Sequence, residues 1–472
     1  MNLDRFGKVL AVFTIIFAAM GVWYIYNTIA YAPLNLDGGY TLSVARIFAN
    51  GGKLFKDINV FYTPMGMWIF SLFYPIFHEN YPGYMVIAML FLILSGIVLY
   101  RILREFSVRN SIAIFFTVYF IVMTIRFDGS LVFLEPFSAF WMLLSILTVI
   151  VSEKGNKLYP YFFSGIFLFF SYWSKQYGLM IIPGIVYFML SGNGENKIKK
   201  LKVIIFTCGF ITCVLVMLIY FKFNNINLLQ VFGLMKGEHS SLIFNPGKIT
   251  GFNYSIKGLI KILIKYSLKC VPVFFIALYY MIAKKIKFRR DIWFTFILLI
   301  GSFLPLYFAY YGHYFIYITP FIIMLVSILI NKIFMSKRII ICFLAMLTIA
   351  LTFLIRDNIR FKNSNCNRKL YQQEVVKLIN NKVVTNSRVL FVGNNALSFI
   401  GNYLPVSNEI GYSLITDLKN SKLHENISSG SYIIYDRKYK LNFGRYNSLY
   451  SEELLGNPSP EHRAIFNIYI RK

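Results

Sequence analysis

Residues 9–40 read VLAVFTIIFAAMGVWYIYNTIAYAPLNLDGGY, an apolar run followed by a short segment with one acidic residue, Asp37. The run Val9–Ala30 is long enough to cross a bilayer, because about 20 apolar residues in a helix span about 30 Å of hydrocarbon. Asp37 is therefore expected where the membrane interface meets water. A carboxylate in that place can take a proton from a hydroxyl group while a lipid-borne substrate lies beside it.

The composition is that of a polytopic membrane protein. Of the 472 residues, 57% are hydrophobic and 14% are charged, and a soluble protein could not bury so much apolar surface. No small-residue cleavage site follows the first run, so we expect a retained helix and not a signal peptide. A net charge of +28 on a soluble protein would suggest nucleic-acid binding. Here most basic residues fall in short loops between apolar runs, as the positive-inside rule describes.

Eleven apolar runs are predicted to span the membrane. With the N-terminus in the cytoplasm, the loops rich in Lys and Arg all fall on the cytoplasmic side, and the short outer loops hold far fewer. This alternation predicts a multi-pass protein of the plasma membrane. The predicted spans cover residues 8–30, 82–104, 110–126, 131–151, 158–174, 176–191, 201–222, 266–284, 291–309, 313–333 and 337–356.

The charge alternation requires that the run Thr63–Phe77 does not cross. This run is short, starts at Thr63-Pro64 and is broken by Pro75, so we expect a helix along the interface within a first outer loop over residues 31–81. Residues 38–50 are predicted to form a second interfacial helix, which ends at Gly51-Gly52.

The chain is predicted to have two domains, an all-α membrane domain over residues 1–356 and an extracytoplasmic domain over residues 357–472. The second is rich in Asn, Ser and Lys, and its pattern indicates one helix and three strands. We therefore expect a small C-terminal α/β domain. The helix is predicted over Arg368–Leu378 and the strands over Arg388–Val392, Tyr432–Tyr435 and Ile465–Tyr469.

Two acidic residues on the predicted outer face have both a structural and a functional interpretation. Asp37 precedes Gly38-Gly39 and a helical stretch, so it either forms an N-cap or Asx turn or acts as a general base. Glu135 precedes Pro136 at the head of a span, where it either complements the helix dipole or belongs to a site.

Cations and aromatic residues on the same face are the candidates for binding an anionic substrate. Lys175, followed by Gln176, either extends to the interface or receives a phosphate. His313 lies among tyrosines and is either part of an interfacial aromatic cluster or a phosphate or sugar contact. Arg126 and Lys56 add positive charge on this face.

Metal binding and ion-coupled transport are both poorly supported. No pair of acidic or histidine residues has ligand spacing, and the five cysteines show neither metal-ligand spacing nor a disulfide framework. The predicted spans are almost free of ionisable residues, whereas a proton- or ion-coupled transporter needs such residues at mid-depth.

Several motifs together resemble one family. Over roughly residues 8–333, the chain looks like the GT-C superfamily of membrane glycosyltransferases, in the branch of protein O-mannosyltransferases and aminoarabinose transferases (ArnT-like). The motifs are Leu36-Asp37-Gly38-Gly39-Tyr40, Asn50–Asp57, the proline-containing run Tyr62–Trp68, Glu135-Pro136, the turn Trp173–Gly178 and Gly312-His313-Tyr314.

The resemblance implies an inverting transfer of a sugar from a polyprenyl phosphate to an acceptor hydroxyl on the outer face, without nucleotide or other cofactor and often without metal. Asp37 matches the catalytic acid of the first loop and would act as the base, and Glu135 falls near a second acidic position. Contacts to the donor are expected from the motif residue Tyr40 and from Lys175, Gln176, His313, Arg126 and Lys56.

One position departs from the family pattern. Protein O-mannosyltransferases carry a second acidic residue where this chain has Gly38, which argues against protein O-mannosylation. The expected partners are a polyprenyl-phosphate-linked sugar, membrane lipids and an acceptor glycan, lipid or protein. A non-enzymatic lipid or saccharide transporter, and a glycan polymerase with a lipid-diphosphate donor, remain as alternatives.

Overall fold

The structure is a computed structural model. It describes most of the membrane part of the chain, a long C-terminal helix and five short strands. The predicted span 266–284 lies outside the described residues. The described residues are 3–56, 60, 63–126, 131–155, 157–192, 195–228, 231, 289–308, 312–332, 337–381, 388–392, 404–405, 432–436, 450–454 and 466–471.

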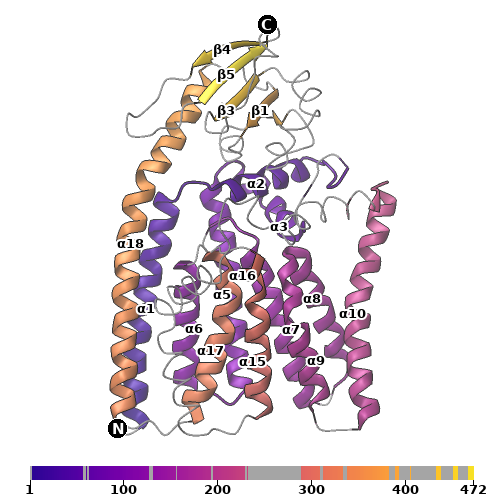
Figure 1. Ribbon diagram of the computed structural model, residues 1–472, viewed down its shortest axis with the longest axis vertical. Coiled ribbons are helices and arrows are strands. Elements are labelled where there is room, and N and C mark those ends of the chain that lie inside the picture. The colour runs from indigo at the N-terminus through magenta and orange to yellow at the C-terminus, as the bar shows by residue number, and fades with distance from the viewer. Residues whose placement is uncertain are drawn as a thin grey trace.

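Most of the helices run side by side in one bundle (Figure 1). Within the described residues, each predicted span corresponds to one helix or to two consecutive short helices. They are α1 (Leu3–Tyr31), α5 (Tyr81–Glu105), α6 (Asn110–Thr124), α7 (Glu135–Gly155), α8 (Tyr159–Ser174), η2 (Gln176–Ile181) with α9 (Ile182–Leu190), α10 (Asn196–Phe223), α15 (Arg290–Ser302) with α16 (Leu304–Phe308), η3 (Gly312–Tyr314) with α17 (Phe315–Lys332), and α18 (Lys337–Asn380).

Length and composition support a membrane protein. Among the described helices, four are long and apolar enough to cross a bilayer, and they lie within α1, α5, α7 and α10. Shorter apolar helices cover Asn110–Thr124, Gln176–Leu190 and Phe315–Asn331. The total of eleven spans and the orientation of the termini stay predictions.

The first predicted outer loop forms short helices at one end of the bundle, next to the strands (Figure 1). We call this end the sheet end. Helix α2 (Leu36–Ala49) agrees with the predicted interfacial helix over residues 38–50. The run Thr63–Phe77 holds α3 (Met65–Leu72) and α4 (Tyr74–Phe77). The 8 residues of α3 cover about 12 Å, which is too short to cross a bilayer.

Two pairs of serines join α7 to α8. Ser138 Oγ donates to the carbonyl of Ser171 at 3.0 Å, and Ser171 Oγ donates to the carbonyl of Ser138 at 2.8 Å. Ser145 and Ser164 repeat this exchange, at 2.9 Å in both directions. Serine side chains are small enough to let helices approach closely, and their hydroxyl groups find hydrogen-bond partners on the facing helix, which a hydrocarbon environment does not supply. The pairs therefore fix how α7 and α8 align at the sheet end.

Helices α8 and α10 touch through glycines. A Cβ added to Gly165 would lie 2.0 Å from the carbonyl oxygen of Phe206, and one added to Gly209 would lie 2.0 Å from that of Phe162. The two backbones therefore approach more closely than any side chain would permit, in the manner of small-residue contacts between membrane helices.

Helix α18 is longer than the sequence pattern predicted. It has 44 residues and a length of about 66 Å, and it continues without a break from the last predicted span through Arg368–Leu378. No Pro or Gly occurs in Lys337–Asn380, so nothing local ends the helix near residue 357. In Figure 1 it runs beside α1 and extends past the bundle to the strands.

Polar contacts hold α18 against the bundle. Arg126, at the end of α6, forms an ion pair with Asp357, and its Nε donates to the same carboxylate at 2.9 Å. Asn27 of α1 donates from Nδ2 to Asn358 Oδ1 at 2.9 Å, with both residues buried. A paired charge or amide is the arrangement in which a polar group can be buried at small cost.

The strands form a mixed five-stranded sheet of order β2-β1-β3-β5-β4. Strand β1 is parallel to β2 and β3, and β5 is antiparallel to β3 and β4. The three predicted strands correspond to β1, β3 and β5. The α/β class of the whole C-terminal domain stays a prediction. The strands are β1 (Arg388–Val392), β2 (Leu404–Pro405), β3 (Tyr432–Asp436), β4 (Tyr450–Leu454) and β5 (Phe466–Arg471).

The glycine contact predicts the effect of a one-carbon change. Gly165→Ala should destabilise the protein by about 1–3 kcal/mol, because backbone atoms cannot move aside as a side chain can. The measurement is the thermal midpoint of the detergent-purified protein. Gly7→Ala is the matched control, since a Cβ there would lie 3.8 Å from its nearest neighbour, Ser111 Oγ. Equal midpoints for the two variants would contradict the contact.

Candidate active site

The first turn of α2 carries Asp37, but another residue caps the helix. Asn35 has the extended backbone of an N-cap, and its Oδ1 accepts a hydrogen bond from the Gly38 N–H at 2.6 Å. The interpretation of Asp37 as the N-cap is therefore wrong. A carboxylate in the first turn is favoured by the helix dipole and stays available for other contacts.

Gly38 is required by the geometry of this cap. A Cβ at this position would lie 2.5 Å from Asn35 Oδ1 and 3.1 Å from Val132 Cβ. A second acidic side chain next to Asp37, as in the family pattern, would therefore displace the cap or the chain around Val132.

Glu135 is a buried carboxylate between two basic groups. It begins α7 and is only 1% exposed. Its Oε1 lies 3.3 Å from Lys175 Nζ and 3.7 Å from His313 Nε2. Burial of a charge is expensive unless it is paired, so Glu135 needs the ammonium group of Lys175 as its partner, and the imidazole of His313 lies beside the same oxygen.

Lys175 lies at the junction between α8 and η2, and it is buried with its ammonium group facing Glu135. The residue has an extended backbone, its N–H donates to Ser171 O at 3.0 Å, and its carbonyl accepts from Gly178 N at 3.0 Å. Extension of the side chain to the interface is therefore wrong for this residue. Burial lowers the pKa of Lys175, but the electrostatic effects of Glu135, Tyr177 and Asp37 outweigh burial and raise this pKa overall.

His313 lies in the aromatic cluster that the sequence indicated, and its contact to a phosphate or sugar stays a prediction. Its ring stacks on Phe133, with centroids 4.7 Å apart, and meets Tyr314 edge-on at 4.6 Å. The Tyr314 hydroxyl lies 3.2 Å from that of Tyr177, which follows Lys175 on the neighbouring element. The aromatic cluster thus fixes the imidazole next to Glu135.

Asp37 belongs to the same electrostatic group. Burial raises the pKa of Asp37 above its ordinary value, Lys175 and His313 lower it, and Glu135 raises it. Unlike Glu135, Asp37 keeps part of its surface exposed. We call Asp37, Glu135, Lys175 and His313 the charged cluster. It is formed by four elements that meet at the sheet end.

The other predicted site residues have different surroundings. Both polar atoms of the Gln176 amide are buried without a hydrogen-bond partner. Tyr40 is buried in the apolar core of the first loop. Arg126 pairs with Asp357. Lys56 is exposed, and no described contact connects it to the charged cluster.

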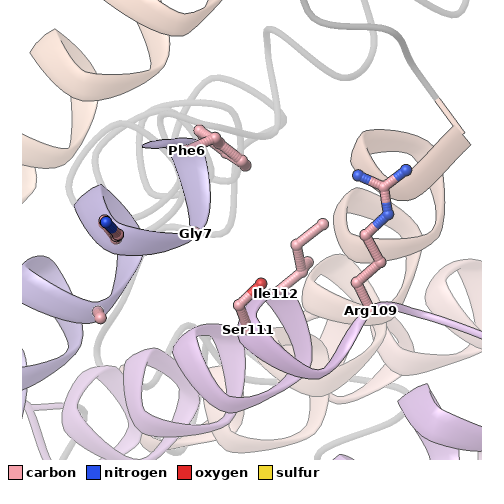
Figure 2. Close-up of a pocket in the computed structure, with 7 residues that line it drawn as sticks. Phe6, Gly7, Arg109, Ser111 and Ile112 are labelled. Atoms are coloured by element: carbon pink, nitrogen blue, oxygen red, sulfur yellow. The ribbon is translucent and has the colours of Figure 1, made fainter. Parts of the chain in front are cut away.

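A cavity at the opposite end of the bundle is separate from this cluster. It has a volume of about 660 Å³ and lies between the start of α1 and the start of α6. Figure 2 shows Phe6 and Gly7 on one helix and Arg109, Ser111 and Ile112 on the other. None of the predicted site residues lines it.

Within the described residues, no group of three His, Cys, Asp or Glu side chains is placed to hold a metal ion. The role of a metal in any reaction stays a prediction. The described part of the chain offers charge compensation through Lys175 and His313, both held by Glu135.

Comparisons with known proteins agree with this architecture. The family described as dolichyl-phosphate-mannose-protein mannosyltransferase matches residues 62–220, roughly a third of the chain. None of the curated proteins matches the sequence. Solved structures that match include ArnT from Cupriavidus metallidurans in the apo state, with 12% identity and a TM-score of 0.58 over 96% of this chain and 97% of ArnT.

The same ArnT bound to undecaprenyl phosphate matches with 11% identity and a TM-score of 0.56, over 96% of this chain and 97% of ArnT. The Archaeoglobus fulgidus oligosaccharyltransferase tethered with an acceptor peptide matches with 11% identity and a TM-score of 0.56, over 100% of this chain and 74% of that one. The resemblance found in the sequence is thus confirmed, and the chain has the fold of the GT-C superfamily of membrane glycosyltransferases.

Proposed function

We propose that this chain is an inverting glycosyltransferase that moves a sugar from a polyprenyl phosphate to an acceptor hydroxyl at the outer face of the membrane. The observation that carries the proposal is the position of Asp37, a partly exposed carboxylate beside two buried basic groups. The fold supports it, since one of the matching structures is ArnT bound to undecaprenyl phosphate.

The basic groups suit the leaving group. When the bond between the anomeric carbon and the phosphate oxygen breaks, the electron pair goes to the phosphate, which gains negative charge. Lys175 and His313 are already held in place by Glu135, so they can stabilise this charge with little reorganisation. A polyprenyl monophosphate needs such cations more than it needs a nucleotide site.

Asp37 suits the acceptor side of the same reaction. The acceptor oxygen attacks the anomeric carbon as the phosphate leaves, and its proton passes to the Asp37 carboxylate. A single displacement of this kind inverts the anomeric centre. The raised pKa of Asp37 makes it a stronger base than an ordinary aspartate, which favours proton transfer near neutral pH.

Glu135 and Gln176 have supporting roles in this proposal. Glu135 is 1% exposed and faces both basic groups, which favours a role in holding them over direct contact with the acceptor. The unpartnered amide of Gln176 can donate to one sugar hydroxyl and accept from another. Sugar binding would recover the free energy that an unpaired buried amide costs.

Asp37→Asn should reduce sugar transfer by about 10²–10⁴-fold, the usual contribution of a general base. It should not lower the thermal midpoint, because the substitution replaces a partly buried charge with a neutral group of the same shape. The measurement is the turnover of radiolabelled polyprenyl-phosphate hexoses and pentoses by the variant and by wild type.

Turnover equal to wild type would exclude Asp37 as the base and make Glu135 the next residue to test. No turnover by folded wild-type protein with any of these donors would contradict a transferase that uses a polyprenyl-monophosphate sugar, and would favour the transporter or the diphosphate-dependent polymerase.

The pH dependence follows from the same residue. Since the pKa of Asp37 is raised, the base becomes protonated and inactive at a higher pH than an ordinary aspartate would. The acidic limb of kcat/KM should therefore have its midpoint above about 4, the usual aspartate value. A profile that stays flat through pH 4–6 would contradict this assignment.

Substitutions of two lysines distinguish a phosphate site in the charged cluster from a phosphate site in the first outer loop. Lys175→Met should reduce kcat by about 10²–10³-fold, because a preorganised charge near the leaving group is lost. Lys56→Met should change kcat by less than about twofold, as expected for an exposed charge. A larger loss for Lys56→Met than for Lys175→Met would place the phosphate at the loop instead.

A further inference from the structure

The segment that connects α1 to α2 leads directly to Asp37. Ala32 and Leu34 are almost fully buried, with exposures of 0% and 2%, and Pro33 between them has no N–H. Buried backbone groups that are not part of a helix need partners from elsewhere. For Leu34 the structure supplies both partners from α18, more than 300 residues later in the sequence.

Gln372 of α18 binds both backbone groups of one residue in this segment. Its Nε2 donates to the Leu34 carbonyl at 2.7 Å, and its Oε1 accepts from the Leu34 N–H at 3.1 Å. Only an amide side chain carries a donor and an acceptor in this arrangement. The pair of bonds therefore fixes both the position and the orientation of Leu34, three residues before Asp37.

Lys369, one helical turn earlier, binds the end of α1. Its Nζ donates to the Ala30 carbonyl at 2.8 Å and to the Ile29 carbonyl at 3.2 Å. These carbonyls belong to the last turn of α1, which has no further intrahelical donors.

Lys369 also contacts the ring of Tyr81, and this tyrosine in turn binds Ala32 in the segment that connects α1 to α2. Lys369 Nζ lies 5.6 Å from the centre of the Tyr81 ring, and the Tyr81 hydroxyl donates to the Ala32 carbonyl at 3.0 Å. Four carbonyls, those of residues 29, 30, 32 and 34, are thus held by three side chains.

We infer that Lys369, Tyr81 and Gln372 form a clamp that positions Asp37 for its reaction, and the functional part of this inference rests on the proposed function. The clamp holds Leu34, and Asn35 next to it caps the helix whose first turn carries Asp37. Few bonds separate the clamp from the carboxylate, so a shift of the segment moves Asp37 directly. These are positioning residues, since they act through Asp37.

The clamp also gives the long helix a function. Helix α18 is fixed within the bundle by the contacts of Asp357 and Asn358 and ends beside the strands. Its outer half therefore serves as a rigid support for the segment before α2. A misplacement of about 1 Å can cost about 10²-fold in rate, so such a support has a measurable effect.

The first test does not depend on activity. In hydrogen–deuterium exchange of the detergent-purified protein, Gln372→Leu should speed exchange in the peptide 29–40 about tenfold, because the Leu34 N–H loses its acceptor. Gln373→Leu, the same substitution at the exposed neighbouring position, should leave exchange unchanged. Equal exchange in both variants would overturn the clamp.

The second test measures how the clamp affects the reaction. Gln372→Leu and Lys369→Met should each lower kcat about 10- to 100-fold and leave the donor KM within about twofold, because the phosphate-binding cations belong to other elements. Lys377→Met, an exposed lysine on the same helix, is the control. A parallel rise in KM, or a loss explained by a lower thermal midpoint, would overturn the positioning role.

The two tests fail in different ways. Inactive wild-type protein would reject the proposed function, and the exchange experiment would still decide whether the clamp exists. Faster exchange combined with wild-type kcat would show that the clamp holds the segment without positioning a reacting group, which would also overturn the inference.

Discussion

The buried carboxylate of Glu135 is the constraint on which the sheet end of the molecule depends. A carboxylate that is 1% exposed needs a positive partner, which Lys175 supplies from another element, and the imidazole of His313 from a third element lies 3.7 Å from the same oxygen. The start of α7, the junction of α8 with η2, and η3 therefore have to meet at one point. The serine pairs along α7 and α8 hold the two helices in the alignment that brings Lys175 to Glu135.

Helix α2 brings Asp37 to the same point, but the environment of Asp37 differs from that of Glu135. Its carboxylate keeps partial exposure, and its burial is compensated only in part by the basic groups. The two acids thus differ in environment, which is the usual way in which one site assigns different roles to two carboxyl groups. Glu135 stays paired, whereas Asp37 is poised to take a proton.

The sequence was informative wherever the decisive signal is local. Apolar runs located the described helices, and the patterns at Arg388, Tyr432 and Ile465 located three of the five strands. The two remaining strands lack that pattern, since β2 has two residues and β4 reads YSEEL. The absence of Pro and Gly in α18 was readable, but the change of composition near residue 357 suggested a boundary.

Contacts between distant residues could not be predicted in the same way. The four members of the charged cluster were each singled out by residue type and by expected side of the membrane, but their pairing depends on tertiary packing. The partners of Arg126 and Leu34 are Asp357 and Gln372, more than 200 residues away, and no local pattern indicates them. The cap at Asn35 is a local contact, and an Asn before a helix is a readable signal, but the sequence analysis considered Asp37 for the cap instead.

The stereochemistry of the product tests the central claim most directly. Within the charged cluster, Glu135 faces Lys175 and His313, and Asp37 is the carboxylate with exposed surface, so the account predicts a single displacement with Asp37 as the base. Nuclear magnetic resonance of the glycosylated product, formed from a polyprenyl-phosphate sugar of known configuration, should show the opposite anomer. Retention of configuration would indicate a double displacement, in which a carboxylate forms a bond to the sugar, and would contradict the role of Asp37 as the base.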